Sequence, residues 1–193
     1  PNTGGWQSWT TISRSVFLEY GRQKMRLEMP AGWFNLNWIQ LTPAAAGTIA
    51  NGTYKFLNRN SAMAAEADTV SSKVVQNPYS GTSVQKWTVQ HRGAGQYSIV
   101  SAANGSSWST FYDRNGEPLT LAGWGYDGSK DRRFLIIPTD NGYCRFAVAD
   151  GGLCIEIAGA SLAAGAAAQQ YEYTGGSHQQ WGILVPSAPA FPT

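Results

Sequence analysis

The chain has 193 residues, a formal net charge of +2 and only 13% charged side chains. This length is enough for one domain with a buried core, and the absence of a basic excess predicts no nucleic-acid partner. No apolar run approaches the roughly 20 residues that a membrane-spanning helix needs, so no membrane partner is expected. The many glycine, aromatic and uncharged polar residues are typical of short strands joined by turns, with rings left available for flat ligands.

Residues 1–41 have alternating apolar positions and are predicted to form three strands. The stretches "TGGWQSW" (3–9) and "FNLNWIQL" (34–41) resemble the last third of family 6 carbohydrate-binding modules, which are β-sandwiches. The resemblance implies that Trp6 lies over a sugar and that Asn37 hydrogen-bonds to it, while Trp9 and Trp38 face the core. Most of such a module is absent from the sequence, so we expect strands without a complete sandwich.

Residues 42–51 are small and uncharged and are predicted to be a linker. Three in-frame copies of one pattern follow, and each begins with alternating apolar residues, continues through a turn and enters a second short strand. Each copy ends on a glycine, five residues and an aromatic residue. The copies begin at Gly52, Gly95 and Gly142, and they end with "GTSVQKW" (81–87), "GSKDRRF" (128–134) and "GGSHQQW" (175–181).

Three all-strand units that cannot cover their own apolar faces are expected to pack around a common axis. The sequence therefore predicts an all-β protein with a β-trefoil over residues 52–186, preceded by a partial β-sandwich segment and followed by a proline-rich tail at 187–193. A propeller would need at least about four blades. The alanine-rich segment 159–170 favours a helix by propensity, but the repeat frame predicts a loop there.

The "Gln-x-Trp" endings and the "Gly-x-Tyr" openings resemble ricin B-type lectin domains, also called family 13 carbohydrate-binding modules. The resemblance covers 52–186, and the middle copy departs from it with Arg132 and Phe134 in place of Gln and Trp. In such repeats a carboxylate on the second strand takes two sugar hydroxyls, an aromatic ring stacks on the sugar, and amide groups complete the contacts. The implied sugar-binding residues are Glu156, Gln169, Tyr171 and His178 in the third repeat, Trp124 and Asp131 in the second, and Glu66 in the first.

Some positions have lost the expected residue type. The carboxylate position of the second repeat is Ser109, and the ring position of the first repeat, counted back from the closing motif, is Asn77. The polar position two residues before the ring is Ala122 in the second repeat. Gln85 and Gln179 are predicted to hold a turn through backbone hydrogen bonds.

Other motifs predict no cofactor and no metal site. "GWGYDG" (123–128) matches G-x-G-x-x-G, but a strand pattern follows it, whereas a dinucleotide site needs a helix there. Cys144 and Cys154 fit no paired metal motif. They lie on a predicted hairpin, and the sequence leaves open whether they form a disulfide.

Two carbohydrate-module resemblances in series predict a non-catalytic module that binds an oligosaccharide or polysaccharide. Its expected setting is a larger secreted, polysaccharide-degrading enzyme, whose catalytic domain is then its partner. Two alternatives stay open. One is a trefoil that itself hydrolyses glycosides, which would need two carboxylates in one pocket. The other is a structural or protein-binding trefoil without sugar sites, which is consistent with Ser109, Asn77 and glutamates where the family usually has aspartate.

Overall fold

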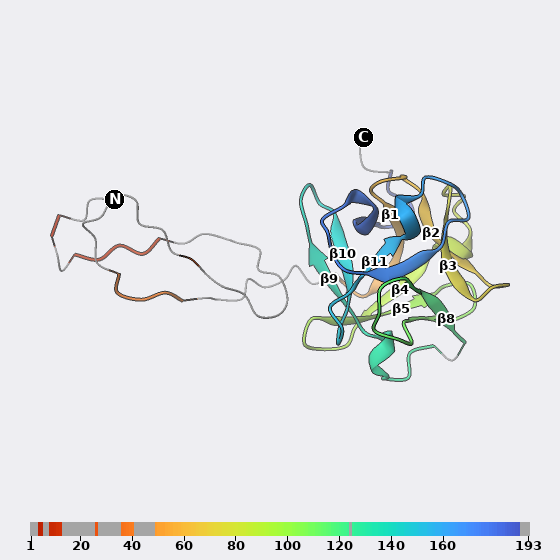
Figure 1. Cartoon of the computed structure of the whole chain (residues 1–193), viewed down its shortest axis with the longest axis horizontal. Helices are drawn as coiled ribbons and strands as arrows, with labels where there is room; N and C mark the ends of the chain where they lie inside the picture. The colour runs from red at the N-terminus through yellow and green to blue at the C-terminus, as the bar shows by residue number, and fades with distance from the viewer. Residues whose placement is uncertain are drawn as a thin grey trace. The chain divides into compact units, whose positions relative to one another are not determined.

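The computed structural model of the chain describes residues 4–5, 8–12, 26, 36–40, 49–123 and 125–189 (Figure 1). The chain divides into two compact units, Pro1–Ala46 and Gly47–Thr193. The division lies inside the segment predicted to be a linker. Each unit is described by itself below.

The second unit contains three successive groups of short strands, and in each group a 3-10 turn directly precedes the last strand. The first repeat comprises β1 (Gly52–Asn58), β2 (Ala64–Asp68), β3 (Lys73–Asn77), η1 (Ser83–Gln85) and β4 (Trp87–His91). The second comprises β5 (Gln96–Ser101), β6 (Ser107–Ser109), β7 (Glu117–Pro118), β8 (Thr120–Ala122), η2 (Lys130–Arg132) and β9 (Phe134–Pro138). The third comprises β10 (Cys144–Val148), β11 (Cys154–Ile157), η3 (Ala158–Ala160), β12 (Ala168–Tyr171), η4 (Ser177–Gln179) and β13 (Trp181–Leu184).

The first and last strands of the repeats close into an antiparallel barrel. The pairings run β1–β4, β4–β5, β5–β9, β9–β10, β10–β13 and back from β13 to β1. The hairpins β2–β3, β6–β8 and β11–β12 are joined by β3–β8 and β12–β7 pairing and by a bridge between Val75 and Ala167. This closed threefold arrangement confirms the predicted β-trefoil, and closure leaves few free strand edges.

Segment 159–170 contains no α-helix. It begins in the short 3-10 turn η3, continues as a loop and ends in β12, as the repeat frame predicts.

Six aromatic side chains fill the centre of the barrel and are fully buried: Phe56, Trp87, Trp108, Phe134, Phe146 and Trp181. Their neighbouring ring centroids lie 4.8–6.2 Å apart. Burial of one such side chain contributes about 1.5–3 kcal/mol. The aromatic residues that close the repeats are therefore part of the core, where no sugar can reach them.

The second repeat exchanges volume between two core positions. Phe134 is smaller than the tryptophans that close the other repeats, and Trp108 occupies the strand position that is Ala65 or Ile155 elsewhere. The ring centroids of Trp108 and Phe134 are 5.8 Å apart, in edge contact. Because close packing requires a nearly constant total volume, the departure from "Gln-x-Trp" is compensated locally.

In the first unit, residues 8–12 and 36–40 lie outside any strand. Trp9 and Trp38 are 51% and 55% exposed, so the prediction that they face a core was wrong. A sandwich core requires a second sheet across from the first, and the described residues of this unit supply none. Asn37 is exposed, and Trp6 lies outside the described residues.

Cys144 and Cys154 are both buried and are not joined by a disulfide. Cys144 lies opposite Pro138 and Trp181, whereas Cys154 lies opposite Ala147 and Tyr171, so the two cysteines do not face each other across the hairpin. Burial raises the pKa of the Cys144 thiol, and its Sγ donates to the Trp181 carbonyl at 3.3 Å.

Candidate functional site

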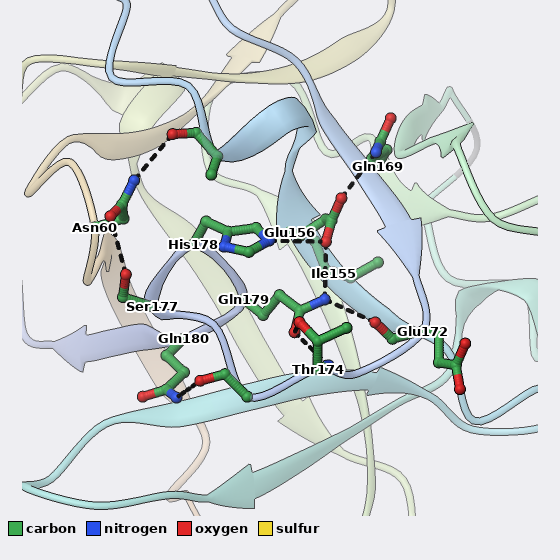
Figure 2. A network of polar contacts seen from close by, with 12 residues as sticks. Asn60, Ile155, Glu156, Gln169, Glu172, Thr174, Ser177, His178, Gln179 and Gln180 are labelled. Atoms are coloured by element: carbon green, nitrogen blue, oxygen red, sulfur yellow. Dashed lines mark hydrogen bonds and ion pairs between the residues drawn. The ribbon is translucent and has the colours of Figure 1, made fainter.

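The third repeat holds a buried carboxylate between two amide side chains (Figure 2). Glu156 on β11 is 4% exposed and lies opposite Gln169 on β12. Gln169 Nε2 donates to Glu156 Oε1 at 2.8 Å, and Gln179 Nε2 donates to Glu156 Oε2 at 2.8 Å. Each carboxylate oxygen is thus fixed by one amide, which leaves further lone-pair positions on each oxygen for a ligand.

His178 on η4 completes the surroundings of this carboxylate. Its Nε2 lies 3.3 Å from Glu156 Oε2, and its side chain is partly exposed. Figure 2 shows the imidazole directed toward the carboxylate from the side opposite Gln169. The structure therefore gathers Glu156, Gln169 and His178, which come from three separate segments of the repeat.

Tyr171 supplies the aromatic surface of the same repeat. It lies two residues after Gln169 on β12, and because side chains two apart on a strand point to the same face, its ring emerges beside the Gln169 amide. The residue is 38% exposed. Among the predicted ring positions, it is the one whose aromatic ring the structure describes.

Gln179 does more than hold a turn, which is all that the sequence predicted for it. Its Nε2 also donates to the Glu172 carbonyl at 2.8 Å, and its Oε1 accepts from the Thr174 backbone N–H at 2.7 Å. One buried amide therefore ties the loop after β12 to the Glu156 carboxylate. This orients the carboxylate before any ligand arrives.

The first repeat repeats this arrangement without a ring. Gln85 Nε2 donates to Glu66 Oε2 at 2.7 Å, and Asn77 Nδ2 donates to Glu66 Oε1 at 2.9 Å. Asn77 Oδ1 accepts from the Gly165 backbone N–H at 3.0 Å. Asn77 is thus held between two repeats, and Glu66 has no aromatic neighbour at the ring position.

In the second repeat the carboxylate comes from the 3-10 turn η2. Ser109 Oγ donates to Asp131 Oδ2, and Arg132 Nε lies 3.8 Å from the same oxygen. Arg132 Nη1 donates to the Gly125 carbonyl at 2.6 Å and pairs with Asp127 at 3.1 Å. Asp131 is therefore engaged by groups of its own repeat.

The predicted ring position of the second repeat was placed two residues too late. Ser109 lies opposite Thr120, and Ser107 lies opposite Ala122. Ala122 is therefore the equivalent of Tyr171, and Trp124 itself lies outside the described residues. Counting back from the closing motif failed because the loop between β8 and η2 is two residues longer than its counterparts.

Sequence reasoning missed a second pair of glutamines. Gln76 on β3 and Gln170 on β12 are fully buried and each lies nine residues before the glutamine of the closing motif. Gln76 holds the loop after η3 in the third repeat, since its Nε2 donates to the Ser161 and Ala163 carbonyls at 2.9 Å. Gln170 holds the loop after β6 in the second repeat, since its Nε2 donates to the Tyr112 carbonyl. Their equal spacing in two repeats is the signal that could have identified them.

Comparison with known families covers most of the chain. Residues 35–122 and 124–190 match the family described as ricin-type beta-trefoil lectin domain-like. The chain belongs to this family. Residues 1–43 match carbohydrate binding module family 6, so both predicted resemblances are confirmed.

One curated protein matches a short part of the chain. The Clotting factor G alpha subunit of Tachypleus tridentatus is 43% identical over 42 residues, which are 22% of this chain and 6% of that protein. The chain thus matches a small part of that relative.

Two solved structures share the fold. The Macrolepiota procera ricin B-like lectin in complex with lactose has a TM-score of 0.64 at 20% identity, over 72% of this chain and 98% of that one. The exo-beta-1,3-galactanase 1,3Gal43A of Clostridium thermocellum has a TM-score of 0.64 at 21% identity, over 76% of this chain and 31% of that one.

Within residues 49–123 and 125–189 and the short described stretches before them, no three His, Cys, Asp or Glu side chains gather as a metal ion would require. A search of the same residues finds no helix with the length and apolar character needed to cross a membrane.

Proposed function

We propose that this beta-trefoil lectin domain is a non-catalytic, secreted module that binds an oligosaccharide or polysaccharide through its third repeat. In its parent protein it is attached to a polysaccharide-degrading catalytic domain. The observation that carries the proposal is the Glu156 carboxylate, held by Gln169 and Gln179 beside an exposed Tyr171 ring. This combination occurs in the third repeat, since the first has Asn77 at the ring position and the second has Ser109 at the carboxylate position.

The chemistry of these residues suits a pyranose. The oxygens of the Glu156 carboxylate are hydrogen-bond acceptors, and their remaining lone pairs take two sugar hydroxyls. The exposed face of Tyr171 packs against the C–H side of the ring. Because Gln179 already orients the carboxylate, little side-chain freedom is lost on binding.

The attachment to a catalytic domain is supported by the galactanase, in which a region similar to this chain makes up 31% of the enzyme. The lactose-bound lectin supports a sugar as the ligand. A module of this kind raises the effective concentration of a linked catalytic domain at an insoluble substrate.

Calorimetric titration with oligosaccharides chosen from a glycan array tests the proposal. Shallow sites bind with dissociation constants on the order of 0.1–1 mM, or about 4–5.5 kcal/mol. Losing a charged hydrogen-bond partner costs about 1.5–3 kcal/mol, so Glu156→Ala is expected to abolish measurable binding. Tyr171→Ala has the same expected result because the stacking surface is removed.

Glu66→Ala is the matched control, because it removes an equivalent carboxylate from a repeat without a ring. Its affinity is expected to equal that of the wild type. Wild-type affinity in Glu156→Ala, or loss of binding in Glu66→Ala alone, would show that the third repeat is not the site.

A further inference from the structure

A hollow of about 290 Å³ lies at the seam between the second and third repeats. The loop between β6 and β7 contributes Phe111 and Asp113, and η2 contributes Asp131. The turn between β10 and β11 contributes Gly151, and β12 contributes Gln170. The volume is near the lower end of small-molecule pockets, which begin at about 300 Å³, and it is large enough for one sugar ring.

Gln170 leaves an acceptor unused at this seam. Its Nε2 donates to the Tyr112 carbonyl, which holds the β6–β7 loop. Its Oε1 is buried and has no hydrogen-bond partner among the residues that the structure describes. A buried oxygen of this kind is costly when unpaired, so a donor that reaches it is bound favourably.

The equivalent glutamine of the first repeat shows what is missing. Gln76 lies at the same register position on β3, and its Oε1 accepts from Ser61 Oγ at 2.7 Å. The turn position occupied by Ser61 is Gly151 in the third repeat, as the matching β1–β2 and β10–β11 registers show. Gly151 has no hydroxyl, so the third repeat lacks a side chain that could donate to Gln170 Oε1 as Ser61 donates to Gln76.

The seam between the third and first repeats is also closed by a second set of contacts. Asn60 Nδ2 donates to the Ala160 carbonyl at 3.0 Å, and Ser177 Oγ donates to Asn60 Oδ1 at 2.9 Å. These bonds bridge the seam just beside Ser61.

At the seam between the second and third repeats the equivalent residues are charged. Asp150 takes the place of Asn60 and pairs loosely with Lys130 at 3.7 Å. Asp113 takes the place of Ala160, and its carboxylate makes no hydrogen bond or ion pair with another described residue. The seam between the second and third repeats therefore contains an open hollow that is rich in hydrogen-bond acceptors. The seam between the third and first repeats is instead closed by hydrogen bonds.

We propose that the hollow between the second and third repeats is a second sugar-binding site, which takes a pyranose whose hydroxyl or ammonium groups donate to Gln170 Oε1 and Asp113. Three aspartates and the Gln170 amide line the hollow beside the ammonium of Lys130, so acceptors outnumber the cation and a ligand rich in donors fits. Phe111 is 61% exposed at the rim and offers an apolar surface to the C–H face of the ring. The site uses none of the residues around Glu156 and goes beyond the function proposed for the third repeat.

The substitution Gly151→Ser tests this site because it returns the hydroxyl that Ser61 supplies in the first repeat. An added Cβ at Gly151 would overlap the carboxylate of Asp113, which is the free end of an exposed side chain and can rotate away. Gly151→Ala is the matched control, since it adds the same carbon without a hydroxyl. Gly151→Ser is expected to unfold at a higher urea concentration than Gly151→Ala, because only serine pairs with Gln170 Oε1.

Binding is followed by ¹H–¹⁵N NMR during titration of the chain with glucose, glucosamine or N-acetylglucosamine. In the wild type, the Gln170 side-chain amide and the Gly151 backbone amide are expected to shift and saturate. Gly151→Ser is expected to weaken this binding at least about tenfold, and clearly more than Gly151→Ala. Asp113→Asn is expected to reduce any preference for glucosamine, which distinguishes an ammonium donor from hydroxyl donors.

Variants distinguish binding in the hollow from binding at Glu156. Glu156→Ala is expected to leave the Gln170 and Gly151 shifts unchanged, whether or not the third repeat binds sugar. The proposal is overturned if none of the three sugars shifts these signals at tens of millimolar, which would indicate that water alone pairs with Gln170. It is also overturned if the shifts survive Gly151→Ser but vanish in Glu156→Ala.

Discussion

Replacing Gln179 with alanine removes the buried amide that ties the loop after β12 to the Glu156 carboxylate. Four hydrogen bonds are lost. Nε2 donates to Glu156 Oε2 and to the Glu172 carbonyl, both at 2.8 Å, and Oε1 accepts from the Thr174 backbone N–H at 2.7 Å and from its hydroxyl at 3.1 Å. A neutral hydrogen bond contributes about 0.5–1.5 kcal/mol and one to a charged group about 1.5–3 kcal/mol. Since the bonds belong to one network and are not additive, we expect Gln179→Ala to lower the free energy of unfolding by about 3–5 kcal/mol.

Urea unfolding monitored by tryptophan fluorescence measures this loss. With an m-value of about 2 kcal/mol/M, the midpoint is expected to fall by about 2 M. Sugar affinity, measured at a urea-free condition where the variant is folded, is expected to fall as well because the carboxylate is no longer oriented.

Gln85→Ala is the matched control for this prediction. Gln85 makes the same four kinds of bond in the first repeat. It donates to Glu66 Oε2 at 2.7 Å and to the Pro78 carbonyl at 2.9 Å, and it accepts from the Ser80 N–H at 2.7 Å and the Ser80 hydroxyl at 3.1 Å. It is expected to be destabilised to the same extent and to keep wild-type sugar affinity. Equal affinities in the two variants, or a midpoint shift below about 0.5 M in Gln179→Ala, would refute the role of Gln179 as a positioning residue.

Two further predictions concern a thiol and a surface carboxylate. Burial raises the pKa of Cys144, so in the native protein its thiol is expected to resist a thiolate-specific reagent and to react only as fast as the chain opens; rapid labelling without unfolding would contradict this. The hydrogen bond from Arg59 at 2.5 Å lowers the pKa of Asp140 below its ordinary value of 3.8. Because the folded-state pKa is depressed, this contribution to stability is present above about pH 4 and is lost as the pH falls below it. Urea midpoints at pH 5 and pH 3 are therefore expected to differ less in Asp140→Asn than in the wild type, and an equal difference would contradict the pairing.

Several features of the site could be predicted from residue order because they depend on local spacing. Glu156 and Gln169 lie on adjacent strands of one hairpin, and His178 precedes the glutamine of the closing motif. A repeat alignment therefore predicts that the three side chains lie together, as they do in the structure. The same alignment failed for Trp124, because a loop lengthened by two residues shifts every position between β8 and η2. Strand register, which reflects pairing with Ser107 and Ser109, corrects that position to Ala122.

The sequence by itself determined the threefold repeat, the alternating strands and therefore the trefoil, since three in-frame units with one apolar face each have few ways to bury it. The positions between repeats depended on tertiary structure, because they bring together segments that are distant in the chain. Gln76 of the first repeat donates to the Ser161 and Ala163 carbonyls of the third, and Gln170 of the third repeat donates to a carbonyl in the β6–β7 loop of the second. Propensity and periodicity describe one strand at a time, and they carry no information about which side chain stands across a seam. Only the closed barrel decided that hydrogen bonds of Asn60 close the seam between the third and first repeats, while a hollow remains between the second and third.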